Sequence, residues 1–165
     1  MNPPNFPQKQ YTIANLPLPD DIHNPTATDD QVSTALGLVC HLVSLTSKYL
    51  CIPLRYTLVC KFSRSAVLFD HGRDVRANTT NSGGGGGVSS NKAAGSRVVY
   101  PLFRERGVID REQLDYGLML LERDVNCLLR TRNVQFRSEW NVLAKMDKLL
   151  MHVIEGDDPS FGDAA

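Results

Sequence analysis

The residues with the greatest chemical potential in this sequence are a cysteine beside a histidine and an aspartate beside a histidine. Cys40-His41 lies in an apolar stretch, and Asp70-His71 lies at the start of a polar one. A thiolate activated by an imidazole is a nucleophile, and a carboxylate that orients an imidazole belongs to many hydrolytic sites. Neighbours on a helix, however, point about 100° apart, so Cys40 and His41 do not form a nucleophile–base pair. We expect Cys40 to fill core space and His41 to lie on the helix flank.

Five consecutive glycines raise the question of a loop that holds phosphate groups. Nucleotide-binding loops place single glycines at fixed positions and follow them with Lys-Ser or Lys-Thr, between a strand and a helix. The stretch GGGGGVSSNKAAGS contains no such dipeptide, and no amphipathic helix follows it. Glycine-rich polar sequence gains too little from burial to order itself, so residues 71–97 are predicted to be a flexible insertion. Asp70 and His71 beside such a loop are poorly placed to hold catalytic geometry.

The four cysteines are Cys40, Cys51, Cys60 and Cys127. No pair has the two-residue spacing of a zinc site, and no histidine pair completes one. We expect reduced thiols that fill small apolar spaces in a cytosolic protein. The sequence thus predicts no catalytic residue, no metal and no cofactor. A small hydrolase that uses Cys40 or His71 is kept as an alternative hypothesis.

The overall charge argues against one class of partner. Lysine plus arginine and aspartate plus glutamate each total 18, which gives a formal charge of zero and a pI of about 6.9. A neutral chain with few, scattered aromatics lacks the electrostatic attraction and the stacking surfaces of nucleic-acid-binding proteins. We expect neither a nucleic acid nor a small-molecule substrate as partner.

Basic residues nevertheless gather in one part of the chain, namely Arg55, Lys61, Arg64, Arg73 and Arg76. Charges on a solvated strand face protect a sheet edge, and this is the first interpretation. The alternative is that Arg55, Lys61, Arg64 and Arg73 contact an anionic lipid surface or an acidic partner. Such contact would weaken as the salt concentration rises.

Residues 29–50 show clear helical periodicity. Thr28 and Gln31 form a capping-box pattern at the start. The apolar positions are Val32, Ala35, Leu36, Val39, Leu42, Val43 and Tyr49. The segment is long enough to span a membrane, but His41 and Lys48 lie within it, and a central cation costs roughly 2.5–3.5 kcal/mol on insertion scales. We therefore expect a buried amphipathic helix.

Two further helices are predicted in the C-terminal half. The first opens at Asp110, with Gln113 completing a second capping-box pattern, and its apolar face consists of Leu114, Leu118, Leu121, Val125 and Leu128. The second opens near Ser138, ends at Gly156 and stacks Val142, Leu143, Met146, Leu149, Leu150 and Val153. The tail over residues 157–165 is predicted to be disordered.

Short β-forming segments occupy residues 54–62, 66–69 and 98–103, and residues 11–18 suggest an edge strand or hairpin arm. Short connections favour antiparallel or mixed sheets over a doubly wound sheet. The predicted architecture is an α/β fold of the α+β type, with short-stranded sheets and three amphipathic helices. It forms a single domain over residues 11–156, after a disordered segment at 1–10.

Tyr116 and Gly117 interrupt the helix that opens at Asp110. Glycine costs up to about 1 kcal/mol in a helix interior, so something is expected to pack closely against Gly117. Packing within the domain is the first interpretation, and a partner helix or strand is the alternative. Tyr116, Gly117 and Tyr56 are therefore the candidate partner interface.

Several segments carry a recognisable family pattern: YTIANLPLP, ALGLVCHLVSLTSKYLCIPLRYTLVCKFSRS, YPLF and QLDYGLMLLERDVNCL. They span residues 11 to about 130, apart from the central insertion, and resemble the C-terminal domain of the UVRAG (UV-radiation-resistance-associated) family. The resemblance implies a Beclin-like α/β repeat domain in a non-catalytic subunit of the class III phosphatidylinositol 3-kinase complex. The coiled coil and N-terminal C2 domain of that family are not found, so we expect a fragment.

The resemblance further implies a scaffold that pairs with the Beclin-type subunit in endocytic trafficking and autophagosome maturation. Such a protein would be cytoplasmic and peripheral on endosomes and autophagosomes, with the kinase activity in another subunit. The alternatives are an anionic-lipid-binding membrane module and the related, autophagy-specific Barkor-type subunit. The pattern IPLRY followed by KFSRS favours the UVRAG family over the Barkor type.

Overall fold

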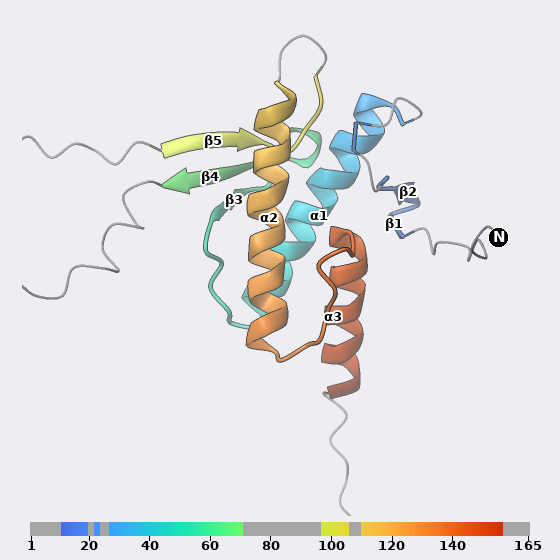
Figure 1. The fold of residues 1–165 in the computed structure, drawn as a ribbon, viewed down its shortest axis with the longest axis vertical. Coiled ribbons are helices and arrows are strands. Elements are labelled where there is room, and N and C mark those ends of the chain that lie inside the picture. Colours follow the sequence, from blue (N-terminus) through green and yellow to red (C-terminus); the bar gives the residue numbers. More distant parts are fainter. Residues whose placement is uncertain (1–10, 20–21, 24–26, 71–96, 106–109, 157–165) are drawn as a thin grey trace, which may run out of the picture.

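The computed structural model of the chain describes residues 11–19, 22–23, 27–70, 97–105 and 110–156. Within these ranges the chain forms three helices and two small antiparallel sheets, which confirms the predicted α/β class (Figure 1). The predicted insertion lies outside the described residues except for Arg97, which is the first residue of a strand. His71, Arg73 and Arg76 also lie outside them, as do both terminal segments.

The N-terminal strands form a short hairpin. Strand β1 is Thr12–Ile13 and strand β2 is Leu16–Pro17, and they pair antiparallel. Ala14 and Asn15 between them have φ angles of 49° and 63°. Two successive residues in the left-handed region match the turn type that two-residue hairpins favour. The prediction of a hairpin arm over residues 11–18 is therefore confirmed.

The second sheet has the strand order β3-β4-β5, with β3 at Thr57–Val59, β4 at Ala66–Asp70 and β5 at Arg97–Pro101. Both strand pairs are antiparallel, and the central Val67 lies opposite Leu58 on one side and Tyr100 on the other. Strand β3 is shorter than the predicted strand over 54–62. The chain turns before that segment ends, because Phe62–Arg64 forms a 3-10 helix, η1.

The helices are α1 at Asp29–Tyr49, α2 at Arg111–Thr131 and α3 at Val142–Gly156. The predicted capping box of α1 is confirmed, because Thr28 Oγ1 accepts a hydrogen bond from the Gln31 N–H while Gln31 Oε1 accepts one from the Thr28 N–H, both at 3.3 Å. Asp110 caps α2 as predicted, but its carboxylate accepts from the Glu112 N–H at 3.4 Å, one position earlier than a capping box requires.

Helix α3 begins later than the sequence predicted. Its start was expected near Ser138, yet the first helical residue is Val142. The side chain of Asn141 accepts a hydrogen bond from the Ala144 N–H at 2.8 Å, so Asn141 supplies the cap. Asparagine is among the best capping residues, and Trp140 before it was wrongly included in the helix.

Helix α2 lies at the centre of the fold and contacts α1, α3 and the strands β4 and β5 (Figure 1). The core therefore joins all three helices to one face of the sheet. Its fully buried large side chains include Leu36, Leu102, Leu114, Leu120, Leu121, Leu128, Leu129, Met146 and Leu149. Leu118 and Leu150, predicted for the same apolar faces, are only partly buried.

Two glycines permit close approaches between backbones. A Cβ atom on Gly37 of α1 would lie 1.8 Å from the carbonyl oxygen of Phe62, so η1 rests directly on the helix. A Cβ atom on Gly117 of α2 would lie 2.8 Å from the carbonyl oxygen of Pro101 in β5. The close packing expected at Gly117 is therefore present, and it occurs within the domain.

The C-terminal end of α1 departs from the predicted pattern. Tyr49 was assigned to the apolar stripe, but it is 73 % exposed. Cys51 was expected to fill core space, but it is exposed as well. Leu50 caps the helix and Cys51 after it adopts a left-handed φ of 54°, a conformation that commonly ends helices.

Candidate interaction surface

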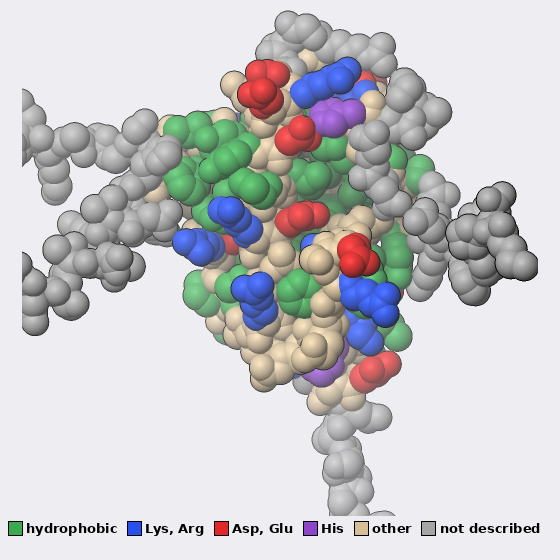
Figure 2. Space-filling view, viewed as in Figure 1, with side chains coloured by type: hydrophobic (Ala, Val, Ile, Leu, Met, Phe, Trp, Pro, Cys, Tyr) green, Lys and Arg blue, Asp and Glu red, His purple; other side chains and the backbone are tan. Residues whose placement is uncertain are grey.

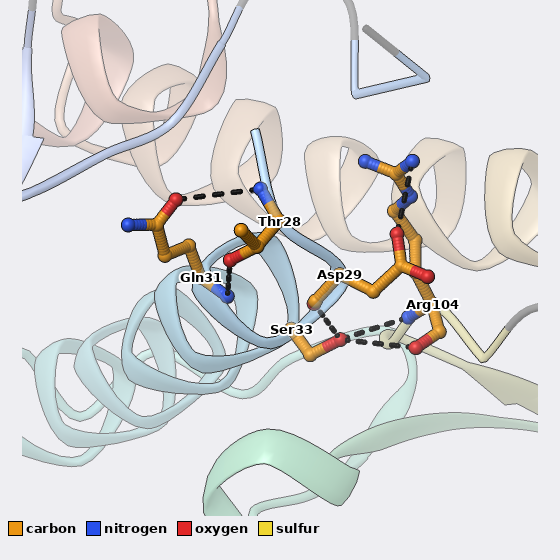
Figure 3. Close-up of polar contacts among 5 residues, drawn as sticks. All are labelled: Thr28, Asp29, Gln31, Ser33 and Arg104. Atoms are coloured by element: carbon orange, nitrogen blue, oxygen red, sulfur yellow. Dashed lines mark hydrogen bonds and ion pairs between the residues drawn. The ribbon is translucent and has the colours of Figure 1, made fainter. Parts of the chain in front are cut away.

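The first turn of α1 is tied to the segment after β5 by polar contacts (Figure 3). The Ser33 hydroxyl donates to the Asp29 carbonyl at 2.6 Å and accepts from the Arg104 N–H at 2.9 Å. The Arg104 guanidinium pairs with the Asp29 carboxylate at 3.1 Å. Ser33 is buried, so these bonds are shielded from water and fix one end of the helix.

A buried carboxylate holds the segment that leads into β3. Asp124 of α2 is fully buried, and its Oδ1 atom accepts from the Arg55 N–H at 2.8 Å and the Tyr56 N–H at 3.2 Å. Burial raises the pKa of the Asp124 carboxyl to about 6, although the two N–H donors oppose the rise. Sequence analysis missed this residue. The signal was its spacing, three residues after Leu121 and four before Leu128, which places it on the buried face of α2.

An apolar groove lies between the C-terminal halves of α1 and α3. It has a volume of about 300 Å³ and is lined by Leu45, Thr46, Tyr49, Leu50, Leu150, Val153 and Ile154. Three of these side chains are largely exposed, with Leu45 at 50 %, Tyr49 at 73 % and Ile154 at 68 %. Large apolar side chains clustered at a concave surface are typical of a contact site for another molecule. Sequence analysis did not single out this groove.

A second apolar surface, the tyrosine patch, consists of Tyr100 and Tyr116. The rings of Tyr100 and Tyr116 pack against each other at a tilt of 40°, with their centroids 4.5 Å apart. Val99, the neighbour of Tyr100 in β5, is exposed on the opposite face of the strand. Figure 2 shows hydrophobic side chains gathered in this region, where α2 crosses β4 and β5. Tyr116, one of the candidate interface residues, is thus at the surface, 37 % exposed.

The other two candidate interface residues lie beneath the surface. Gly117 is buried against β5. Tyr56 is only 7 % exposed, and its ring packs against Phe69 with centroids 5.7 Å apart. These two residues support the sheet and helix behind the tyrosine patch, whereas Tyr116 is available for contact.

Of the predicted basic residues, the three that the structure describes, Arg55, Lys61 and Arg64, have different surroundings. Arg64 pairs with Glu105 at 2.7 Å and lies over the Phe103 ring at 5.0 Å. Arg55 lines a separate hollow of about 210 Å³ together with Asp70 and Arg97. Lys61 is exposed just before η1. Contact of these residues with lipid or an acidic partner stays a prediction, and the pairing of Arg64 with a carboxylate reduces its attraction for anions.

Cys40 and His41, which suggested a nucleophile and a base, lie in different surroundings. Cys40 is buried in the core, as predicted, and His41 is exposed on the helix flank. Among the described residues, no group of three or more histidine, cysteine, aspartate or glutamate side chains is arranged to hold a metal ion. None of the helices in the described ranges combines the length and the apolar character that crossing a membrane requires.

The described residues therefore form an α/β domain that exposes an apolar groove and a tyrosine patch. The chain belongs to the family described as "Vacuolar sorting 38 and autophagy-related subunit 14", whose family model matches residues 4–94. This agrees with the family resemblance seen in the sequence segments.

Two curated proteins are similar to the chain. Vacuolar protein sorting-associated protein 38 of Schizosaccharomyces pombe is 27 % identical over 155 residues, which cover 92 % of this chain and 27 % of that protein. The UV radiation resistance-associated protein of Mus musculus is 29 % identical over 117 residues, covering 71 % of this chain and 14 % of that protein. The chain thus spans about a quarter or less of these relatives. No solved structure matches the chain.

Proposed function

We propose that this chain is a non-catalytic scaffold domain from a subunit of the class III phosphatidylinositol 3-kinase complex. The proposal includes pairing with the Beclin-type subunit in endocytic trafficking and autophagosome maturation, peripheral to those membranes. It is supported by membership of a family whose description names vacuolar sorting and an autophagy-related subunit. The names of the two relatives, which refer to vacuolar sorting and to resistance to UV radiation, fit the same assignment.

The observation that carries the proposal is the apolar groove between α1 and α3. A protein partner with an apolar helix or strand would remove Leu45, Tyr49 and Ile154 from water, which is the main favourable term in association. Aromatic side chains such as Tyr49 are enriched among residues that dominate binding energy. A concave groove receives a ridge of side chains, whereas a membrane surface takes up side chains that protrude.

Pairing between this chain and a Beclin C-terminal domain tests the proposal. We expect the two to co-purify, and we expect Ile154→Asp to weaken binding by at least about tenfold, because a carboxylate would be buried without a partner in the contact. Isothermal titration calorimetry would give the two dissociation constants. Ile154 is mostly exposed in the free chain, so circular dichroism of the variant should match that of the parent.

A matched variant separates the two apolar surfaces. Tyr116→Ser removes an exposed aromatic from the tyrosine patch and should leave the affinity within about twofold, since most interface truncations away from the central residues have small effects. Loss of binding with Tyr116→Ser alone would assign the contact to the tyrosine patch and contradict the groove. If longer proteins that carry their coiled coils also fail to associate, pairing with a Beclin-type subunit is wrong.

A further inference from the structure

Two cysteines that are 20 positions apart in the sequence meet inside the domain. The Sγ atoms of Cys40 in α1 and Cys60, just after β3, lie 3.5 Å apart. Both thiols are free in this structure. A disulfide bond is about 2.05 Å long, so the two sulfurs need to approach each other by about 1.5 Å to form one.

The surroundings give the two sulfurs different roles. Cys40 is fully buried, while Cys60 is only partly buried and lies where an oxidant in solution can approach it. Burial, followed by the influence of Cys60, raises the pKa of the Cys40 thiol well above its ordinary value, so Cys40 stays protonated. Cys60 is therefore the sulfur that reacts first, and Cys40 is the one that resolves the product.

The local structure around Cys60 permits a disulfide bond with Cys40. Cys60 follows Val59, the last residue of β3 that pairs with β4, so the backbone of Cys60 is outside the ladder. The next segment is held firmly, because Ser65 accepts from the Lys61 N–H at 2.9 Å and donates to the Phe62 carbonyl at 2.8 Å. Cys60 thus has some freedom of adjustment while its neighbours keep it beside α1.

We propose that Cys40 and Cys60 are a reversible dithiol–disulfide pair that is oxidised by hydrogen peroxide. The Cys60 thiolate attacks the peroxide oxygen, the O–O bond breaks, and Cys60 becomes a sulfenic acid as hydroxide leaves and takes up a proton. The Cys40 sulfur then attacks the Cys60 sulfur, its proton joins the departing hydroxyl, and water leaves. In sum, two thiols and one peroxide give one disulfide and two waters.

The crosslink joins α1 to the segment that leads into η1, which already rests on Gly37. It closes a loop of about 20 residues in the unfolded chain, so the oxidised form should melt roughly 10 °C higher than the reduced form. The groove residues begin five positions beyond Cys40, at Leu45, and are untouched by the bond. This inference is independent of the proposed partner and goes beyond it.

Hydrogen peroxide treatment of the purified 165-residue chain tests the pair. After unreacted thiols are blocked by alkylation, peptide mass spectrometry should find a Cys40–Cys60 linked peptide that disappears on reduction. The bond should form at least about tenfold faster in the native chain than in urea, because the fold holds the sulfurs together. Equal rates in both conditions, or a folded chain that yields no linked peptide, would overturn the inference.

Cysteine variants make the assignment specific. The double variant Cys51→Ser, Cys127→Ser keeps the pair and should form the bond at the parental rate. Cys60→Ser removes the reactive sulfur from a partly exposed position and should abolish both the linked peptide and the rise in melting temperature under peroxide. Crosslinks from Cys51 or Cys127 at the expense of the pair would contradict the assignment.

Discussion

The two halves of α1 have the same amphipathic character but different surroundings. The N-terminal half is fixed on several sides, by the capping box, by the Ser33 and Arg104 contacts, and by Gly37 against the backbone of η1. The C-terminal half leaves Leu45 and Tyr49 exposed beside α3. The N-terminal half is therefore held by the domain on several sides, whereas the C-terminal half combines a buried Val43 with the exposed Leu45 and Tyr49.

This difference shows that the burial of side chains alone does not identify the residues that stabilise each half of the helix. In the N-terminal half, a missing side chain at Gly37 and a hydroxyl at Ser33 determine how closely two segments approach. In the C-terminal half, the exposed Leu45 and Tyr49 contribute little to the isolated domain because water already reaches them. Substitutions should therefore have opposite consequences for stability and binding in the two halves.

The largest effect on stability is expected at Gly37. Gly37→Ala places a Cβ atom 1.8 Å from the Phe62 carbonyl oxygen, and neither backbone can move without disturbing its neighbours. We expect a loss of about 3 kcal/mol in the free energy of unfolding, since overpacking at a rigid contact costs this much or more. Urea denaturation followed by circular dichroism would measure it.

Alanine substitutions at two other glycines provide comparisons with Gly37→Ala. Gly156→Ala adds a Cβ atom to open space, so its effect should be within about 0.5 kcal/mol or slightly stabilising. Gly117→Ala meets the Pro101 carbonyl at 2.8 Å and should fall between the two. If Gly37→Ala is as stable as Gly156→Ala, then η1 does not rest on α1 as described.

The second effect is a dependence of the free energy of unfolding on pH, which arises from the buried Asp124 of α2. Its folded-state pKa of about 6 is above the ordinary value of 3.8, so the folded chain binds this proton more tightly than the unfolded chain does. The stabilisation is present below 3.8 and is lost as pH rises through about 6. At most about 3 kcal/mol is involved.

Asp124→Asn should remove this dependence while keeping an oxygen that can accept from Arg55 and Tyr56. The measurement is the free energy of unfolding of parent and variant across pH 4 to 7, taken as a difference so that other carboxylates cancel. Glu139→Gln, at an exposed position, is the control. A difference that does not change with pH would show that the carboxyl titrates normally.

A smaller loss is expected at Ser33. Ser33→Ala removes the acceptor of the buried Arg104 N–H bond, which would cost about 1–2 kcal/mol. Ser63→Ala, at an exposed serine of η1, should have almost no effect. Thermal unfolding of the three proteins would rank them, and equal melting temperatures would mean that the Ser33 contacts do not stabilise the start of α1.

The smallest effect on stability belongs to the groove. Ile154→Asp, the variant expected to weaken partner binding, should change the free energy of unfolding by less than about 0.5 kcal/mol, as is usual for exposed positions. A variant that unfolds instead would show that Ile154 supports the domain itself, and the contrast between the two halves of α1 would be lost.

Much of the fold could be predicted from the sequence because local patterns decide it. The 3.6-residue periodicity located all three helices, and Thr28 and Asp110 marked two of their starts. The sequence could not show that Tyr116 is exposed while its neighbour Gly117 is buried. Helical spacing assigns a residue to a face of the helix but does not show which segment covers that face. The sequence likewise could not show that Tyr56 is only 7 % exposed, since a tyrosine in a strand segment suits a core and an interface equally.

By itself the sequence determined the three helices, the segments that form strands, the antiparallel or mixed character of the sheets, and the family. Only the tertiary structure decided which apolar side chains are left uncovered, that Gly37 receives η1, and that Cys40 meets Cys60. The physical reason is the distance along the sequence over which each kind of interaction acts. Helix and strand preferences act between residues a few positions apart, whereas burial and contact depend on segments that the chain brings together from far along its length.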